Sequence, residues 1–125
     1  MQNILILNVD DNINARYAKT RLLMNAGFRV EEAGDGGAAL TLVAQLMPTL
    51  VLLDVKLPDM SGHEVCRRIK ANPVTGNVLV MQISAALISH DDTVRGMESG
   101  ADYYLAAPFD PNDLVSNVRA LLPAH

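Results

Sequence analysis

Two hydrophobic periods alternate along the chain, and each change of period predicts a new element. Short apolar runs, of which Ile4–Val9 and Leu50–Leu53 are the clearest, are typical of strands buried on both faces of a parallel sheet. Between the runs, apolar residues recur every three or four positions, as they do in a helix. The residues expected to face the core from the first helix are Ala15, Ala18, Leu22 and Ala26. Gly27 follows them, where the left-handed end of a helix favours glycine.

The pattern predicts five strands and five helices in strict alternation. The expected strands cover residues 4–9, 28–33, 50–53, 78–83 and 103–106. The expected helices cover residues 12–26, 39–46, 61–72, 90–99 and 110–121. Ser61 and Glu64 have the spacing of a capping box, and Asp110 before Pro111 is a typical helix start.

This alternation predicts an α/β fold of the flavodoxin-like, doubly wound (βα)5 type. Its five-stranded parallel sheet is expected to have the strand order 2-1-3-4-5, with right-handed crossovers. In such sheets, ligands bind outside the carboxyl ends of the strands. Because the composition shows no linker-like change, residues 1–125 are expected to form one domain.

The charge balance argues against direct contact with nucleic acid or anionic membranes. Ten Lys and Arg against fourteen Asp and Glu give a formal net charge of −4 at pH 7, whereas such contacts need a basic surface. All apolar runs fall short of the roughly 18 residues that span a bilayer, so no membrane insertion is expected. Cys66 is the single cysteine and the N-terminus lacks a basic signal-peptide region, so a cytoplasmic location is expected.

Three aspartates follow the predicted first and third strands. Asp10 and Asp11 come directly after the first strand, and Asp54 ends the third. Because like charges at close range repel, converging carboxylates are stable mainly when a cation neutralises them. Oxygen ligands without His or Cys favour Mg²⁺ or Mn²⁺ over Zn²⁺. An aspartate beside such an ion can be the nucleophile that forms an aspartyl-phosphate, and Asp54 is the best placed.

Three separated motifs resemble those of the receiver domains of two-component response regulators. They are the acidic pair in Val9–Asn12, the acceptor strand and loop in Leu52–Gly62, and the approach to the fifth strand in Gly100–Leu105. The resemblance covers essentially the whole chain. It implies a phosphoacceptor in a two-component phosphorelay, as part of a response regulator or of a hybrid sensor histidine kinase, and not an enzyme in its own right. A phosphatase or mutase of the aspartyl-phosphate type is disfavoured, because Lys56 stands where its second acid would be.

The resemblance also assigns roles to the residues of the acidic edge. It implies that Asp54 accepts phosphate from the phosphohistidine of a histidine kinase or phosphotransfer domain. It further implies that Mg²⁺ is held by Asp11, Asp54 and the backbone carbonyl of Lys56. Asp10 would act mostly through a metal-bound water.

Two further positions match residues that the family uses for switching. Ser84 matches the Ser/Thr position whose hydroxyl turns toward the phosphoryl group, and Tyr104 matches the aromatic residue that swings inward. From the residues alone, Ser84 could also be a loop or cap residue and Tyr104 an ordinary half-buried aromatic. Partner contacts in the family favour the face made by the fourth helix, the fifth strand and the fifth helix. A homodimer through that face is therefore one expected assembly.

The chain departs from the family at Ala107. The family has a lysine there, whose ammonium pairs with the phosphoryl oxygens, so its loss would weaken the coupling between phosphate and output. Lys56 is one candidate to supply positive charge from the other side of the site. The departure also keeps an alternative function open, that of a pseudo-receiver that binds proteins without being phosphorylated. Because the matching peptide bond of the family is cis, Ala107–Pro108 is expected to be cis as well.

Overall fold

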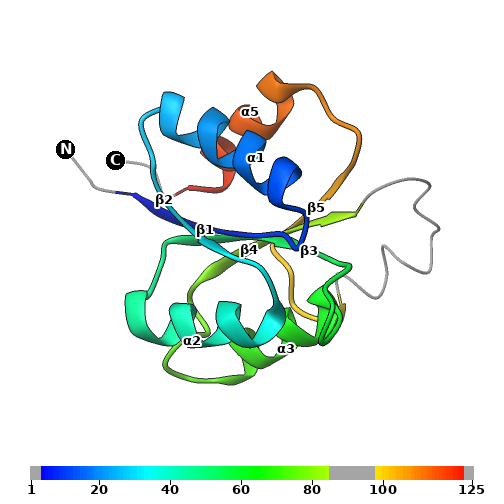
Figure 1. Ribbon diagram of the computed structural model, residues 1–125. Coiled ribbons are helices and arrows are strands. Elements are labelled where there is room, and N and C mark those ends of the chain that lie inside the picture. Colours follow the sequence, from blue (N-terminus) through cyan, green and yellow to red (C-terminus); the bar gives the residue numbers. More distant parts are fainter. Residues whose placement is uncertain (1–3, 85–97, 123–125) are drawn as a thin grey trace.

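A parallel five-stranded sheet forms the centre of the computed structural model, which describes residues 4–84 and 98–122 (Figure 1). Its strands are β1 (Leu5–Val9), β2 (Arg29–Ala33), β3 (Leu50–Asp54), β4 (Leu79–Ser84) and β5 (Tyr103–Ala106). They lie in the order β2-β1-β3-β4-β5, and every neighbouring pair is parallel. The predicted fold class and strand order are confirmed.

Helices cover both faces of the sheet. They are α1 (Ile13–Asn25), α2 (Gly36–Leu46), α3 (Gly62–Ala71) and α5 (Pro111–Leu121). Figure 1 shows α1 and α5 on one face and α2 and α3 on the other. The helix predicted at residues 90–99 falls almost entirely outside the described residues. None of the described helices combines the length and hydrophobicity that crossing a bilayer requires.

The middle strand β3 supplies both halves of the core. Leu50 and Leu52 pack toward α1 and α5, while Val51 and Leu53 pack toward α2 and α3. All four side chains are fully buried, and burying each one contributes about 2 kcal/mol to folding. A strand covered on both faces has no solvent side, which explains why its sequence is a continuous apolar run rather than an alternating one.

Polar side chains begin the helices at the predicted places for α1 and α3, whereas α2 begins at Gly36, three residues before its predicted start. Asn12, Asp35 and Ser61 each accept a hydrogen bond from a backbone N–H of the first turn, at 2.7–3.1 Å. The predicted capping box at α3 is only half formed. The Glu64 side chain pairs with Arg67 and Arg68 instead of reaching back to the N-cap residue.

The inward face predicted for α1 is wrong by about one position. The buried residues of this helix are Lys19 and Leu23, whereas Ala15 and Ala18 are exposed and Leu22 is only half-buried. The apolar pattern excluded a lysine from the inward face, but a lysine can be buried when its ammonium is paired. Lys19 has such a partner in the acidic residues after β1, as described below.

The start of α3 lies directly against the end of β3. The Gly62 N–H donates to the Val55 carbonyl at 2.7 Å. A Cβ atom at Gly62 would press on the carbonyl oxygen of Asp54 and would lie 2.8 Å from the Cα of Val55. Only glycine allows the helix to begin this close to the strand, so Gly62 helps to fix the backbone of Asp54.

Replacing Gly62 by alanine should therefore destabilise the protein. We expect Gly62→Ala to lower the free energy of unfolding by about 2 kcal/mol, because backbone atoms on both sides would have to shift. Gly37→Ala is the matched control, since its Cβ would meet the Asp59 side chain at an ordinary 3.4 Å, also in the first turn of a helix. Urea unfolding curves of both variants measure the difference, and an equal loss in the two would contradict the argument.

Candidate functional site

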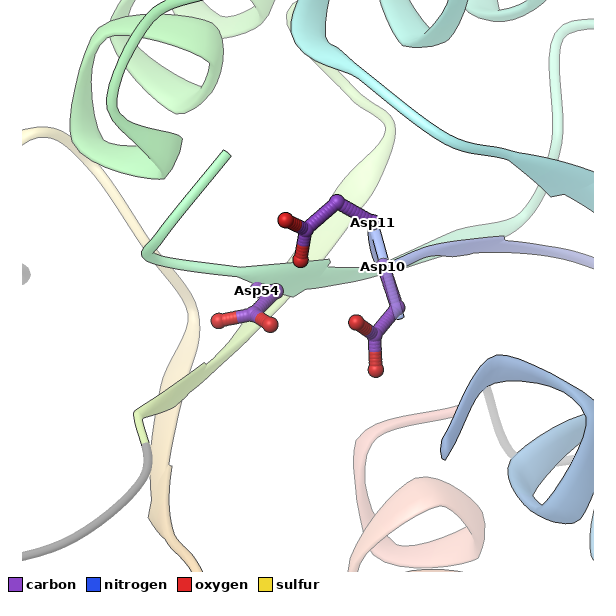
Figure 2. Close-up of side chains that lie close together, drawn as sticks. All are labelled: Asp10, Asp11 and Asp54. Carbon is purple, nitrogen blue, oxygen red and sulfur yellow. The ribbon is translucent and has the colours of Figure 1, made fainter. Parts of the chain in front are cut away.

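The carboxyl ends of β1 and β3 bring three aspartates together. Asp10 and Asp11 follow β1, and Asp54 is the last residue of β3. One carboxylate oxygen from each lies within 4.8 Å of the others, and Figure 2 shows the three side chains gathered at this edge of the sheet. Asp10 is buried, Asp54 is half-buried and Asp11 is exposed. The predicted acidic cluster is therefore present in the folded chain.

Asp10 is held in place by contacts on every side. One carboxylate oxygen accepts from the Asn12 N–H at 2.9 Å, and the other pairs with the Lys19 ammonium at 2.8 Å. Its own N–H donates to the Ala33 carbonyl at 3.1 Å, and its carbonyl accepts from the Arg16 guanidinium at 2.8 Å. The loop after β1 is thus tied both to α1 and to the end of β2.

Lys19 is a site residue that the hydrophobic pattern of the sequence did not reveal. Its side chain is only 10% exposed, and that of Asp10 is 5% exposed, so this ion pair is nearly removed from water. The sequence does hold a signal for its burial, because Lys19 stands one helical turn before the apolar Leu23. The structure buries both residues. A lysine on an inward register, downstream of two acids at the end of a buried strand, indicates a paired cation.

Burial and neighbouring charge raise the pKa of Asp54 above its ordinary value. Desolvation is the largest cause, and the charge of Asp10 acts in the same direction. The Lys56 N–H, which donates to an Asp54 carboxylate oxygen at 3.1 Å, and the charge of Lys19 both lower the pKa in opposition. The site remains short of positive charge. Three oxygen ligands in this arrangement fit a hard divalent cation.

The loop between β3 and α3 is anchored to the start of α2. Asp59 accepts hydrogen bonds from the N–H groups of Gly36 and Gly37, both at 2.8 Å. These two bonds lower the pKa of Asp59 below its usual range, because they favour the charged form. The loop that follows Asp54 is therefore closed at its ends by the hydrogen bond between Gly62 and Val55 and tied to α2 through Asp59.

A cavity of about 670 Å³ opens beside the carboxylates, between α1 and the loop that follows β5. The three aspartates and Lys19 form part of its wall. The remainder of the wall is largely apolar and includes Ala15, Ala18, Leu22, Ala107 and Phe109. The Ala107–Pro108 peptide bond is cis, as expected.

The other predicted site residues occupy different positions relative to this cavity. Ser84 is the last residue of β4 and lines the cavity. Lys56 also lines the cavity and is exposed. Tyr104 lies on β5 but is not part of the cavity lining. Its ring stacks on that of His63, with 6.4 Å between the centroids. The Tyr104 hydroxyl is buried and has no hydrogen-bond partner among the described residues.

Comparison with known proteins gives consistent matches. The family model for the response regulator receiver domain matches residues 6–119. The DNA-binding response regulator MtrA of Mycolicibacterium paratuberculosis is 45% identical over 117 residues, which cover 94% of this chain and 50% of that protein. The DNA-binding dual master transcriptional regulator RpaA of Synechocystis is 38% identical over 122 residues, which cover 98% of this chain and 49% of that protein. The chain thus spans about half the length of these relatives.

A solved structure agrees with these sequence matches. The response regulator receiver domain protein (CheY-like) from Methanospirillum hungatei superimposes with a TM-score of 0.88. The two chains are 27% identical, and the match covers 95% of this chain and 93% of the other. The fold and the sequence therefore point to the same family.

The relatives correct one prediction. The partner prediction that excluded nucleic acid is wrong, because both MtrA and RpaA are named as DNA-binding regulators. That prediction rested on a net charge of −4, and the net charge of a domain does not by itself exclude nucleic acid as a partner. The homodimer face included the predicted fourth helix, which lies almost entirely outside the described residues.

Removing the charge of Asp54 should stabilise the protein when no divalent cation is present. Because its pKa is raised, the ionised carboxylate opposes folding at neutral pH. We expect Asp54→Asn to gain about 1 kcal/mol at pH 7 in EDTA, which corresponds to a few degrees in Tm. The gain should vanish as the pH falls below the ordinary value of 3.8, where Asp54 is protonated in both the folded and unfolded states.

Asp59→Asn is the matched control for this measurement. Its pKa is lowered, so its ionised form favours folding, and the substitution should lower the Tm at pH 7 instead of raising it. Thermal unfolding followed by circular dichroism at pH 7 and at pH 3 gives both comparisons. A lower Tm for Asp54→Asn in EDTA at pH 7 would show that the ionised Asp54 carboxylate does not oppose folding.

Proposed function

Since the chain belongs to the response regulator receiver domain family, we propose that residues 1–125 act as a single phosphoacceptor domain in two-component signalling. The observation that carries this proposal is the convergence of Asp10, Asp11 and Asp54 at the carboxyl edge of the sheet. The donor would be the phosphohistidine of a histidine kinase or of a phosphotransfer domain, and the location would be the cytoplasm. The names of the relatives make DNA binding a candidate output for a protein that contains this domain.

Asp54 is the proposed phosphoacceptor. It ends the central strand β3 and lines the cavity, and the contact of Gly62 with its backbone supports a fixed position. A carboxylate oxygen of Asp54 would attack the phosphorus atom, and the bond from phosphorus to the donor's imidazole nitrogen would break. The imidazole would take up a proton, and hydrolysis of the aspartyl-phosphate would later restore the carboxylate. No other catalytic activity is proposed.

The acidic cluster suits Mg²⁺, or Mn²⁺ in its place. Asp11, Asp54 and the backbone carbonyl of Lys56 would hold the ion, and Asp10 would contribute through a bound water. When bound, the ion would offset the negative charge on the transferred group. Oxygen donors within 4.8 Å of one another and the raised pKa of Asp54 both support a cation at this place.

Ser84 and Tyr104 are proposed to respond to the phosphate. Ser84 lines the same cavity as Asp54, so its hydroxyl is suited to donate to a phosphoryl oxygen. Tyr104 is one strand further along and has a buried hydroxyl without a hydrogen-bond partner among the described residues. A polar group of this kind is costly to keep buried, which favours a side chain that changes position.

The test is phosphorylation of the purified protein with acetyl phosphate, followed by intact mass. We expect a gain of about 80 Da that requires Mg²⁺, is abolished by EDTA, and is lost in Asp54→Asn. Asp113→Asn is the control, because Asp113 is an exposed carboxylate in the first turn of α5. It should gain the same mass as the unchanged protein.

A short-lived phosphate would leave no adduct, so binding of beryllofluoride with Mg²⁺ is measured in parallel by calorimetry. Absence of both the adduct and beryllofluoride binding would reject the phosphoacceptor function. It would then favour the pseudo-receiver alternative, in which the domain acts by binding proteins alone.

A further inference from the structure

Lys19 is an unusual residue for the inward face of a helix. Its ammonium lies 2.8 Å from an Asp10 carboxylate oxygen, and both side chains are almost fully buried. Burying a charge is costly unless it is paired, and replacing a buried pair by apolar groups is often neutral or stabilising. Stability alone therefore gives little reason for a lysine at this position.

The position of Lys19 relates it to the phosphoacceptor. Lys19 and Asp54 line the same cavity, and Asp10, the partner of Lys19, is part of the same cluster as Asp54. Ala107 lines this cavity too, but it carries no charge. Among the described residues of the lining, the cationic ones are Lys19 and Lys56. Lys56 is exposed, whereas Lys19 is shielded from water, where an ion pair is stronger.

We propose that Lys19 of α1 supplies the ammonium that pairs with the phosphoryl oxygens on Asp54, in place of a lysine at position 107. This inference rests on the proposed phosphoacceptor function. A phosphoryl group adds close to two negative charges and three acceptor oxygens. Lys19 already pairs with Asp10, which belongs to the same cluster as the acceptor, and its flexible side chain can contact a second anion without a change in the backbone.

Two roles for Lys19 predict different measurements. If Lys19 only holds Asp10 in place, its removal should disturb the carboxylates and weaken Mg²⁺ and phosphoryl binding together. If it pairs with the phosphoryl group, its removal should weaken phosphoryl binding while Mg²⁺ binding becomes tighter, because a positive charge beside the carboxylates has gone. The affinity for Mg²⁺ is therefore expected to change in opposite directions in the two cases, which separates the two roles.

The experiment uses the full chain with Lys19→Met and Lys19→Gln. Glutamine can still donate a hydrogen bond to Asp10 but carries no charge, so it tests charge separately from position and serves if Lys19→Met does not fold. Beryllofluoride, at saturating Mg²⁺, serves as the phosphoryl probe. We expect its affinity to fall about tenfold in both variants, with a slower gain of mass from acetyl phosphate. The affinity for Mg²⁺ alone, from calorimetry, should rise.

Ala107→Lys in the Lys19→Met background provides a rescue. The ammonium of a lysine at position 107, on the loop after β5, should restore the beryllofluoride affinity to within about threefold of that of the unchanged protein. The matched control is Lys70→Met, because Lys70 makes an ion pair of the same length, 2.8 Å, with Asp102 and does not line the cavity. This control should lower the Tm and leave both affinities unchanged.

Several outcomes would overturn the proposal. One is beryllofluoride binding in folded Lys19→Gln that equals that of the unchanged protein. Another is a joint loss of Mg²⁺ and beryllofluoride affinity that Ala107→Lys does not rescue, which would assign Lys19 a purely structural role. If the unchanged protein neither gains phosphate nor binds beryllofluoride, the phosphoacceptor function itself has failed, and that result is distinct from a failure of Lys19.

Discussion

The crowding of three carboxylates at the end of a buried strand is the constraint around which this domain is arranged. One carboxylate oxygen from each of Asp10, Asp11 and Asp54 lies within 4.8 Å of the others. The packed strands behind them, the Lys19 ammonium and two backbone N–H groups hold the carboxylates there. The fully buried residues of β3 fix one side, and the hydrogen bonds of the β1 loop fix the other. The packing of the fold therefore offsets the destabilising effect of these crowded carboxylates, as is common at functional sites.

Much of the fold follows from the sequence because the relevant signals are local and redundant. The run Leu50–Leu53 reads as a strand buried on both faces, and the structure buries it on both. The alternation of elements and the handedness of crossovers restrict the sheet to a few doubly wound strand orders, and the structure has the flavodoxin-like one that was predicted. The three aspartates could be placed together because parallel strands end at one edge of the sheet. Periodicity and topology sufficed for these features.

The features that sequence reasoning missed depend on contacts between distant residues. Lys19 was left out of the inward face because apolarity alone defined that face, whereas its burial depends on Asp10 in the preceding loop. Glu64 has the spacing of a capping box but bonds to Arg67 and Arg68, since a charged partner competes with a backbone N–H. The exclusion of nucleic acid failed for a different reason, because it inferred the absence of a partner from net charge alone. The roles of Ser84, Tyr104 and the Lys56 carbonyl remain predictions.

The close approach of α3 to β3 also limits the directions from which Asp54 can be reached. On the side of Gly62, helix backbone lies directly against strand backbone, and no side chain of a partner can enter between them. The described residues leave Asp54 open to the cavity between α1 and the loop after β5. In phosphoryl transfer the attacking and leaving atoms lie roughly in line with the phosphorus. If Asp54 accepts phosphate as proposed, a donor protein would present its histidine through this cavity, and the shape of the cavity mouth would help to determine which donors fit.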